Sequence, residues 1–262
     1  MSLNAKPYVV MLTAFGLVLA ACSSDVSTIA GSGERVSRTF DLEAFSEIDA
    51  SNAFRVEVEV DSGASQSVVV EIDDNLADRL DVRVDGQRLH VGLDDDVRVR
   101  LDDPPTAAIT VNELSWLGAS GASAVSVQGV AAAAFDLRAS GASTIELFGT
   151  VDALVGDLSG ASKLEVADIG GGDVELGLSG ASGGALSGEA SRLSLDVSGA
   201  SRVDTRDLTA LDAVIEASGA SDVKVFASGS VQADASGASN VTVAGDAELD
   251  ANTSGSSTVE RG

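Results

Sequence analysis

Apolar and polar residues alternate along most of this chain with a period of two, the pattern of a β-strand whose two faces meet different surroundings. Between residues 160 and 179, Leu164 and Val166 alternate with charged residues, and Val174 and Leu176 alternate with polar or small ones. No apolar stripe at helical spacing interrupts this stretch. The pattern predicts an all-β protein in which each such stretch supplies two short strands.

A turn signature, Ser-Gly-Ala-Ser, separates these stretches. Its first copy is Ser120–Ser123, and seven later copies follow at steps of 18 to 20 residues, the last altered to Ser254-Gly255-Ser256-Ser257. A two-strand unit cannot bury its apolar face alone, whereas parallel stacking about 4.8 Å apart joins these faces into one core. The repeat therefore predicts a single parallel β-helix, or β-solenoid, of about 18–20 residues per turn, with right-handed coiling expected.

The signature itself fits a tight structural corner, because glycine accepts positive φ and serine can hydrogen-bond along a stack. The alternative is that the stacked serines form a polar binding strip. Both interpretations place the signature at the same edge of the solenoid.

Residues 34–117 also alternate, but out of register with the signature. Asp85-Gly86 separates two alternating runs and indicates a hairpin, and residues 97–101 form a further predicted strand before Pro104-Pro105. The signature at Ser62–Ser65 is predicted to make a turn between two strands. We interpret this region as the start or cap of the same solenoid. Residues 34–262 then form one domain, with a β-rich part at 34–117 and the repeats at 118–262.

Residues 1–21 have the proportions of a secretory signal peptide, because the apolar run from Val9 to Ala21 is shorter than the roughly 20 residues of a membrane span. The run ends in Leu19-Ala20-Ala21-Cys22, which resembles the lipobox of bacterial lipoproteins. The resemblance implies cleavage before Cys22, acylation of that residue and a membrane anchor made of acyl chains such as palmitate. Ser23 and Ser24 favour the outer membrane. Residues 22–33 are then the lipidated cysteine and a flexible tether.

The lead-in to the repeats resembles one bacterial family. Ile109, Val111 and Leu114 form an I-x-V-x-x-L pattern after the glycine-closed hairpin, and the run of S-G-A-S turns follows. This arrangement is similar to the "putative auto-transporter adhesin head", or GIN, domain over about residues 40–259. The resemblance implies a β-helical fold in secreted or envelope proteins, often lipoproteins, with an adhesin-like role and no catalytic motif.

The chain is strongly acidic, with 41 Asp and Glu against 16 Lys and Arg and a net charge of −25. Loss of residues 1–21 removes one lysine and no acid, which leaves −26. Such a charge repels nucleic acid and anionic lipid headgroups, so we expect neither as a partner. Aromatic residues that could stack on sugar rings are few: the chain has one Trp, one Tyr and seven Phe.

Apparent catalytic strings are products of the repeat. Residues 180–184, Gly-Ala-Ser-Gly-Gly, satisfy G-x-S-x-G, but a nucleophile elbow needs a following helix and a partner histidine. The sole histidine, His90, lies on a predicted N-terminal strand, where we expect it to face solvent. One histidine and one cysteine exclude an ordinary zinc site. The sequence predicts a protein that is not an enzyme.

Acidic residues are predicted to stack in the solenoid. Asp196, Glu216 and Asp234 occupy the same position in three successive turns, two residues before each signature. Stacked carboxylates repel one another unless they are protonated or bridged by a cation. The hypothesis is that this column binds a divalent cation such as Ca²⁺; the alternative is a solvated acidic face, because Ca²⁺ takes about six or more oxygens. We expect no other cofactor.

Three classes of function remain open at this point. The leading interpretation is a non-enzymatic envelope lipoprotein whose regular face binds a polysaccharide or an envelope or host protein. The second is a polysaccharide lyase or hydrolase built on a β-helix, although its short repeats leave little room for a loop-lined cleft. The third is a structural envelope protein that self-assembles through the edge near Val259.

Overall fold

The structure is a computed structural model that describes residues 28–94 and 98–262. It is built almost wholly from strands, with one short 3₁₀ helix. The elements are β1 (Thr28–Ala30), β2 (Arg35–Phe40), β3 (Glu47–Ala50), β4 (Arg55–Val60), β5 (Ser67–Asp73), η1 (Asp74–Arg79), β6 (Leu80–Asp85), β7 (Arg88–Leu93), β8 (Arg98–Arg100), β9 (Thr106–Val111), β10 (Trp116–Ala119), β11 (Ala124–Ala139), β12 (Thr144–Leu158), β13 (Lys163–Gly170), β14 (Asp173–Leu178), β15 (Gly183–Val197), β16 (Arg202–Ala217), β17 (Asp222–Ala235), β18 (Asn240–Ala244), β19 (Glu248–Thr253) and β20 (Thr258–Arg261).

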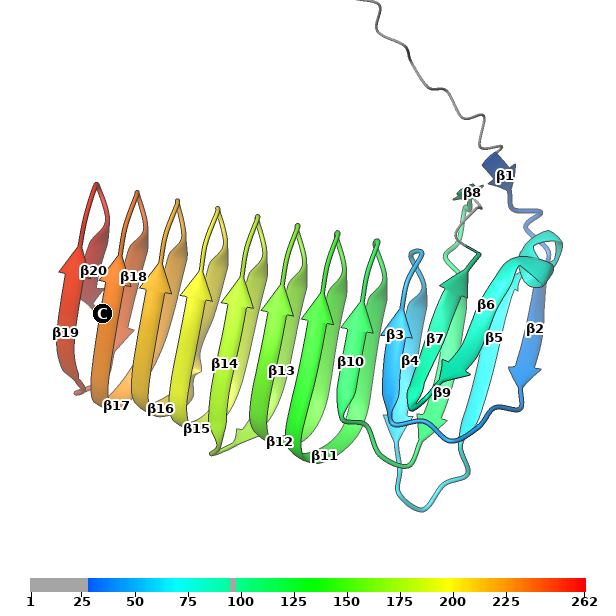
Figure 1. The fold of residues 1–262 in the computed structure, drawn as a ribbon, viewed down its shortest axis with the longest axis horizontal. Helices are drawn as coiled ribbons and strands as arrows, with labels where there is room; N and C mark the ends of the chain where they lie inside the picture. The colour runs from blue at the N-terminus through cyan, green and yellow to red at the C-terminus, as the bar shows by residue number, and fades with distance from the viewer. Residues whose placement is uncertain (1–27, 95–97) are drawn as a thin grey trace, which may run out of the picture.

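The strands from β10 onward stack as a parallel β-solenoid, as the repeat predicts (Figure 1). We call the half-coils that lead into each corner the front sheet and those that leave it the back sheet. Successive coils are in register on both: Leu137 pairs beside Gly156 on the front, and Val125 beside Ile145 on the back. Followed toward the C-terminal end, the chain rises along the front sheet, turns at the corner and descends along the back sheet. This path is right-handed (Figure 1).

In several coils the two short strands predicted for each repeat are one continuous strand. In β11, β12, β15, β16 and β17 a single strand of 14 to 16 residues runs from one corner to the next. The bend is made by β-bulges, seen as register shifts such as that between Gln128 and Val130. A bulge turns the strand and disrupts the ladder only locally, so most of the strand stays paired through the bend.

Each signature makes a structural corner. Its glycine has φ between 72° and 78°, and the alanine N–H donates to the glycine carbonyl of the preceding coil, as from Ala142 to Gly121 at 2.8 Å. The second serine is buried in every copy but the last, and in every copy except that of Ser201 its hydroxyl donates to the carbonyl of the first, as from Ser143 to Ser140 at 2.7 Å. Most second-serine hydroxyls are thus used inside the corner, which supports the structural interpretation for that column of serines.

The interior is one continuous core from Phe45 to Ala247, formed by the inward residues of both sheets. Phe54 and Phe135 are the largest fully buried side chains, and most of the core is Val, Leu, Ile and Ala. Because alternate residues point inward, the residues between them are left on the two outer faces. Those outer faces carry the candidate sites.

The solenoid begins earlier than the signature does. β3 pairs in parallel with β10 and β7, and β4 pairs in parallel with β11 and β9, so β3 and β4 form a coil in the middle of the stack. Its corner is Asn52 and Ala53, with φ of 58° and 64°. The Ser62–Ser65 signature lies between β4 and β5, in the predicted strand-to-strand turn.

Antiparallel strands close the N-terminal end. β6 and β7 form the hairpin predicted at Asp85-Gly86, and β2, β5 and β9 form an antiparallel extension of the same sheet. Leu76 of η1 is fully buried beneath it. Of the strand predicted at residues 97–101, Val97 lies outside the described residues, and Arg98–Arg100 form β8, which pairs in parallel with β1.

Candidate functional site

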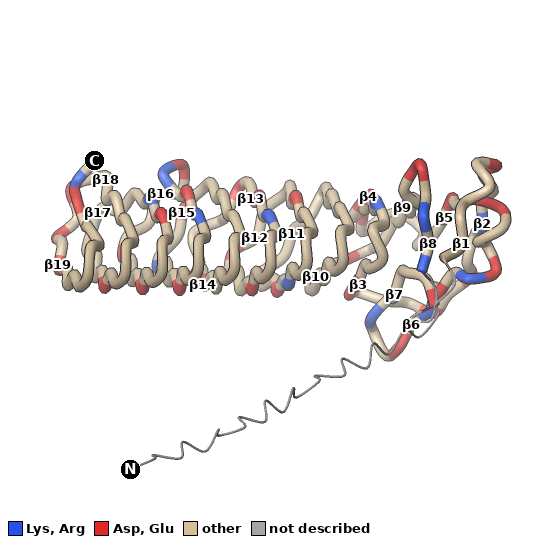
Figure 2. The backbone as a smooth tube through the Cα atoms, turned by 90° about the horizontal axis from the view of Figure 1, so that it is seen from above, with Lys and Arg blue, Asp and Glu red and all other residues tan. Residues whose placement is uncertain are grey.

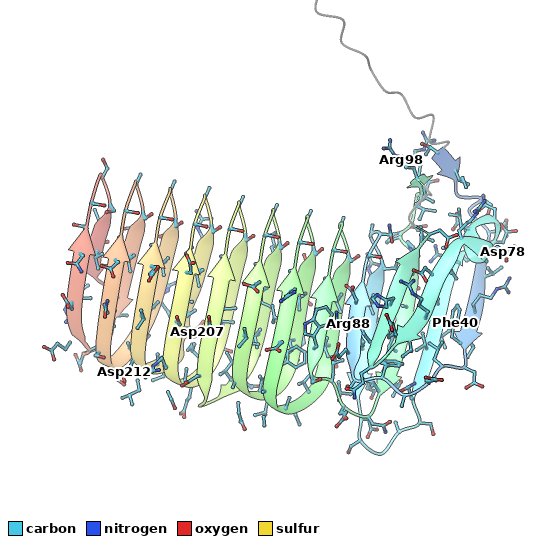
Figure 3. All side chains as sticks on the ribbon, viewed as in Figure 1. Phe40, Asp78, Arg88, Arg98, Asp207 and Asp212 are labelled. Atoms are coloured by element: carbon cyan, nitrogen blue, oxygen red, sulfur yellow. The ribbon has the colours of Figure 1, made fainter. Side chains whose placement is uncertain are left out.

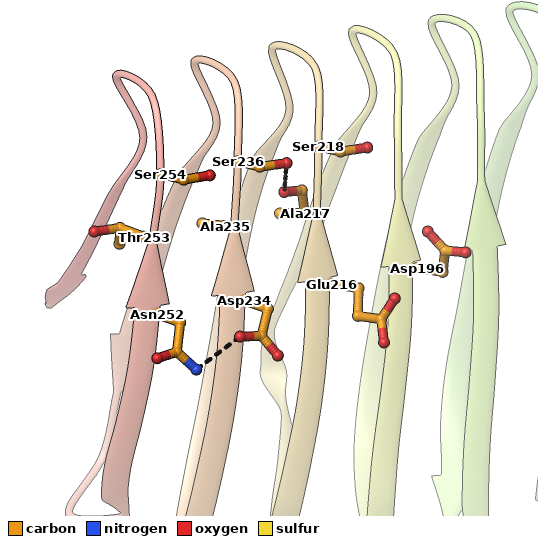
Figure 4. A pocket seen from close by; sticks show the side chains of 10 residues that line it. All are labelled: Asp196, Glu216, Ala217, Ser218, Asp234, Ala235, Ser236, Asn252, Thr253 and Ser254. Carbon is orange, nitrogen blue, oxygen red and sulfur yellow. Dashed lines mark hydrogen bonds between the residues drawn. The ribbon is translucent and has the colours of Figure 1, made fainter.

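The predicted acidic column exists as a row on the front sheet. Asp196 pairs beside Glu216, Glu216 beside Asp234, and Asp234 beside Asn252, on four successive coils (Figure 4). We call the three carboxylates, Asp196, Glu216 and Asp234, the acid row. Adjacent strands lie about 4.8 Å apart, so the row repeats a negative charge at that interval.

The acid row borders a shallow groove of about 450 Å³ beneath the corners. Asp196 and Glu216 are exposed, whereas Asp234 is half-buried and accepts a hydrogen bond of 2.8 Å from the Asn252 side-chain amide. The upper wall holds the first serines of three corners, Ser218, Ser236 and Ser254. The groove therefore offers carboxylate, amide and hydroxyl oxygens in a line.

The row has the donors but not the enclosure of a calcium site. Within residues 28–94 and 98–262, no group of three or more His, Cys, Asp or Glu side chains is placed to hold a metal ion. All three carboxylates project from one flat sheet, so a cation above them would meet oxygens from one side only, while Ca²⁺ takes about six to eight ligands. Calcium binding by the acid row stays a prediction.

The acid row is part of a larger difference between the two sheets (Figure 2). Outside the bends, the front half-coils after the first signature carry ten carboxylates and two arginines, whereas the back half-coils carry five carboxylates and four cations. The bends between them hold five more carboxylates and one arginine: Asp152, Asp168, Glu189, Asp207, Asp246 and Arg206. The front set is Asp136, Asp157, Asp173, Glu175, Asp196, Asp212, Glu216, Asp234, Glu248 and Asp250 with Arg138 and Arg192; the back set is Glu146, Glu165, Asp204, Asp222 and Glu260 with Lys163, Arg202, Lys224 and Arg261. Acidity is thus concentrated on one face.

A cluster of Trp116, Arg88 and Glu47 at the N-terminal end of the front sheet was not predicted. The guanidinium of Arg88, which is labelled in Figure 3, lies 3.7 Å from the centre of the Trp116 ring, and Arg88 Nε donates to Glu47 Oε2 at 2.8 Å. The three side chains belong to β7, β10 and β3, which are adjacent in the sheet. Nearby, half-exposed His90 places Nδ1 3.6 Å from Asp49 Oδ2, so it lies on the outer face as expected.

The only sequence signal for this cluster is that Trp116 alternates with inward Leu117 and must therefore face outward. Its partners are 28 and 69 residues away in sequence, respectively, and only the register of β3 and β7 brings them together. The stacked guanidinium and the ring cover each other, a favourable cation–π arrangement.

Fold and surface together define a β-solenoid that presents two flat, chemically different outer faces. The chain belongs to the family described as "Putative auto-transporter adhesin, head GIN domain", whose model matches residues 44–247. This match confirms the resemblance drawn from the signature. An adhesin head is a component of the cell surface or envelope.

Several solved structures share this fold. A putative lipid binding protein from Parabacteroides distasonis superposes with a TM-score of 0.81 at 21% identity, over 90% of this chain and 99% of the other. Putative adhesins from Parabacteroides distasonis and Parabacteroides merdae both have TM-scores of 0.76, at 18% and 15% identity, over 90% and 89% of this chain and 100% and 98% of theirs. At these identities the likeness establishes the fold. None of these descriptions is of an enzyme.

No curated protein matches the sequence. The described part of the chain contains no helix long and apolar enough to cross a membrane. The predicted lipidation site, Cys22, lies outside the described residues, as do the signal peptide and most of the tether.

Proposed function

We propose that this protein is a non-enzymatic, adhesin-like protein of the bacterial cell envelope, and that its front sheet is the binding surface. The observation that carries the proposal is the concentration of carboxylates on one of two sheets that are otherwise built alike. A flat face with a repeat of about 4.8 Å suits an extended partner, which can make the same contact on successive coils.

The partner we favour is a polysaccharide whose hydroxyl groups meet the carboxylate, amide and serine oxygens of the groove. Calcium supports this binding in the proposal, because a cation between the acid row and the glycan would share its coordination sites between both. An envelope or host protein with a basic surface is the other partner that the charge would attract.

The proposal places the protein at the membrane through acyl chains on Cys22, with the outer membrane favoured. The lipobox-like sequence Leu19–Cys22 supports this placement. Labelling cells with a clickable palmitate analogue tests it: the wild-type protein should take up the label, and Cys22→Ser should not. Equal labelling of the two would refute the anchor.

Binding of the chain from Ser23 onward to arrays of bacterial and host glycans, with and without Ca²⁺, tests the surface. We expect calcium-dependent binding that is lost when all three carboxylates of the acid row are changed to alanine. The matched control changes three carboxylates of the back sheet, Glu146, Glu165 and Asp204, to alanine. Loss of binding in both triple variants would indicate a general charge effect and refute the front sheet as the site. If the chain binds no glycan but does bind an envelope or host protein, the front sheet stays the proposed binding surface and the proposed ligand becomes a protein.

A further inference from the structure

One coil of the back sheet departs from the repeat immediately after its corner. Where the flanking coils have Lys163-Leu164-Glu165 and Arg202-Val203-Asp204, this coil has Gly183-Gly184-Ala185. The pairing is in register on both sides, so Gly183 lies between Lys163 and Arg202, and Ala185 lies between Glu165 and Asp204. Two outward positions with almost no side chain thus separate two charged walls.

The departure leaves an open notch of about 300 Å³ in the outer face. The nearest atom to a methyl group added at Gly183 would be the Arg202 carbonyl oxygen, at 3.9 Å. We define the notch by Lys163 and Glu165 on one wall, Gly183 and Ala185 on the floor, and Arg202 and Asp204 on the other wall. Adjacent strands lie about 4.8 Å apart, so the backbones of the two walls are roughly 10 Å apart.

The charges in the notch are segregated along the strand direction. Lys163 and Arg202 face each other at the end near the corner, and Glu165 and Asp204 face each other two residues further on. Two residues of strand span about 6.6 Å. The notch therefore has a cationic end and an anionic end separated by that distance.

The groups on the β13 wall are available to a ligand. Lys163 and Glu165 are both exposed, and neither forms an ion pair shorter than 4.0 Å with any other residue that the structure describes. The Arg202 side chain is 75% exposed, and Asp222 holds it through an ion pair of 3.3 Å to Nε. That contact fixes one side of the guanidinium, and its terminal amino groups make no hydrogen bond to any residue that the structure describes.

Asp204 is held in its charged form on the opposite wall. Arg206 donates to its carboxylate at 2.6 and 2.9 Å, and this hydrogen bonding lowers the pKa of the Asp204 carboxyl. Glu165 and Asp204 therefore face the anionic end at neutral pH, with Glu146 beside Glu165 on the preceding coil; Asp204 shares its charge with Arg206. A bare divalent cation would meet Lys163 and Arg202 in the same notch, and a phosphate would meet the carboxylates, so neither simple ion fits the whole site.

We propose that the notch binds a linear zwitterion, with its carboxylate between Lys163 and Arg202 and its ammonium between Glu165 and Asp204. The ligand class is an ω-amino acid or a lysine-type end group, in which an extended chain of a few methylenes separates the two charges. Charge complementarity at both ends and the matching span select this class. The notch lies on the sheet opposite the acid row, so the site is independent of the proposed glycan surface.

Chemical-shift titration of the full chain in detergent micelles tests the proposal, with 6-aminohexanoate as the probe. The amide signals of residues 183–185 should move. The affinity for 6-aminohexanoate should exceed the affinity for hexanoate or hexylamine at equal ionic strength by roughly three- to fivefold, because the second charge adds one exposed ion pair. Glycine, whose two charges are too close to reach both ends, should bind no better than the singly charged probes.

Three variants then locate the site. Lys163→Gln and Glu165→Gln should each weaken 6-aminohexanoate binding by roughly two- to fivefold. Gly183→Thr, which restores the residue found at the equivalent position of β12, should fill the notch and abolish binding while the fold is kept. Arg138→Gln removes the same charge from the front sheet and should leave binding unchanged.

The proposal is overturned if hexylamine alone binds as well as 6-aminohexanoate, because the site is then only an acidic surface. It is equally overturned if Gly183→Thr binds the probe like the wild type. Loss of glycan binding in the acid-row variant with unchanged 6-aminohexanoate binding would separate this site from the front sheet.

Discussion

The corner glycines lie close against the backbone of the preceding coil, and Gly180→Ala measures the cost of filling that space. Gly180 has φ of +76°, and a methyl group added there would lie 2.5 Å from the Gly160 carbonyl oxygen of the preceding coil. An ordinary contact between a carbon and a carbonyl oxygen is about 3.3–3.6 Å. The corner would therefore have to move by most of an ångström, against backbone rather than a flexible side chain.

Two contributions to the free energy of unfolding can be separated here. A left-handed backbone conformation costs a non-glycine residue about 1–2 kcal/mol, and an overpacked methyl group adds about 1–3 kcal/mol. We expect Gly180→Ala to lower the stability by roughly 2–5 kcal/mol. Gly86→Ala is the matched control, because Gly86 has φ of +66° but nothing within 4 Å of the added methyl. It should lose only the first contribution.

Gly183→Ala completes the series, since this position has neither positive φ nor a close neighbour. It should be neutral or stabilising by up to about 1 kcal/mol. Urea unfolding of the three variants with unchanged m-values gives the comparison. Hydrogen exchange at Ala181, whose N–H donates to the Gly160 carbonyl at 2.7 Å, gives a local measure. If Gly180→Ala loses no more stability than Gly86→Ala, close stacking is not what requires glycine at the corner.

Three further outcomes are expected. Ser162→Ala removes the 2.7 Å bond to the Ser159 carbonyl and should cost about 1 kcal/mol in urea unfolding, whereas Ser201→Ala should cost less, because the Ser201 hydroxyl is buried without a partner; equal losses would contradict a role for the bond. The pKa of Asp204 is lowered by hydrogen bonding to Arg206, so its stabilisation is present above the ordinary pKa of 3.8 and is lost as the pH falls through the lower folded value. Arg206→Gln should therefore be less stable than wild type near about pH 6 and approach it below about pH 3, and a pH-independent difference would refute this linkage. Millimolar Ca²⁺ should raise the midpoint of thermal unfolding of the wild type by a few degrees but not that of the variant with amides in place of the acid row; equal shifts would place calcium elsewhere.

The repeat made the solenoid predictable because stacking constrains two sets of positions at once. Inward residues alternate so that the core is continuous, and corner residues are small so that coils can approach. Both constraints appear directly in the sequence as period-two apolar runs and as the signature. The stack of Asp196, Glu216 and Asp234 followed for the same reason: equal spacing from the corner places residues at the same height on successive coils.

The sequence predicted that residues 34–117 start or cap the solenoid, but not that β3 and β4 form a complete coil, because the corner of that coil does not use the signature. Asn52 and Ala53 take positive φ without glycine, and Gly121 of the next coil stacks on them. Asparagine reaches this region more readily than other non-glycine residues, but alanine does so rarely. The Trp116 cluster and the notch were missed for another reason. Each depends on side chains from different coils or strands. A pattern within one repeat does not show which side chains lie beside it on the neighbouring coil.

The outer positions of a solenoid carry more functional information than its inner ones. Stacking fixes the inward residues and the corners, whereas an outward residue on a flat sheet has only to be soluble. Carboxylates spread over both sheets would keep the protein equally soluble. Such a distribution would also reduce the repulsion between charges about 4.8 Å apart. Ten front-sheet carboxylates against five on the back, and a glycine notch between segregated charges, are not required by the fold. These departures from what stacking needs are where binding should be sought first.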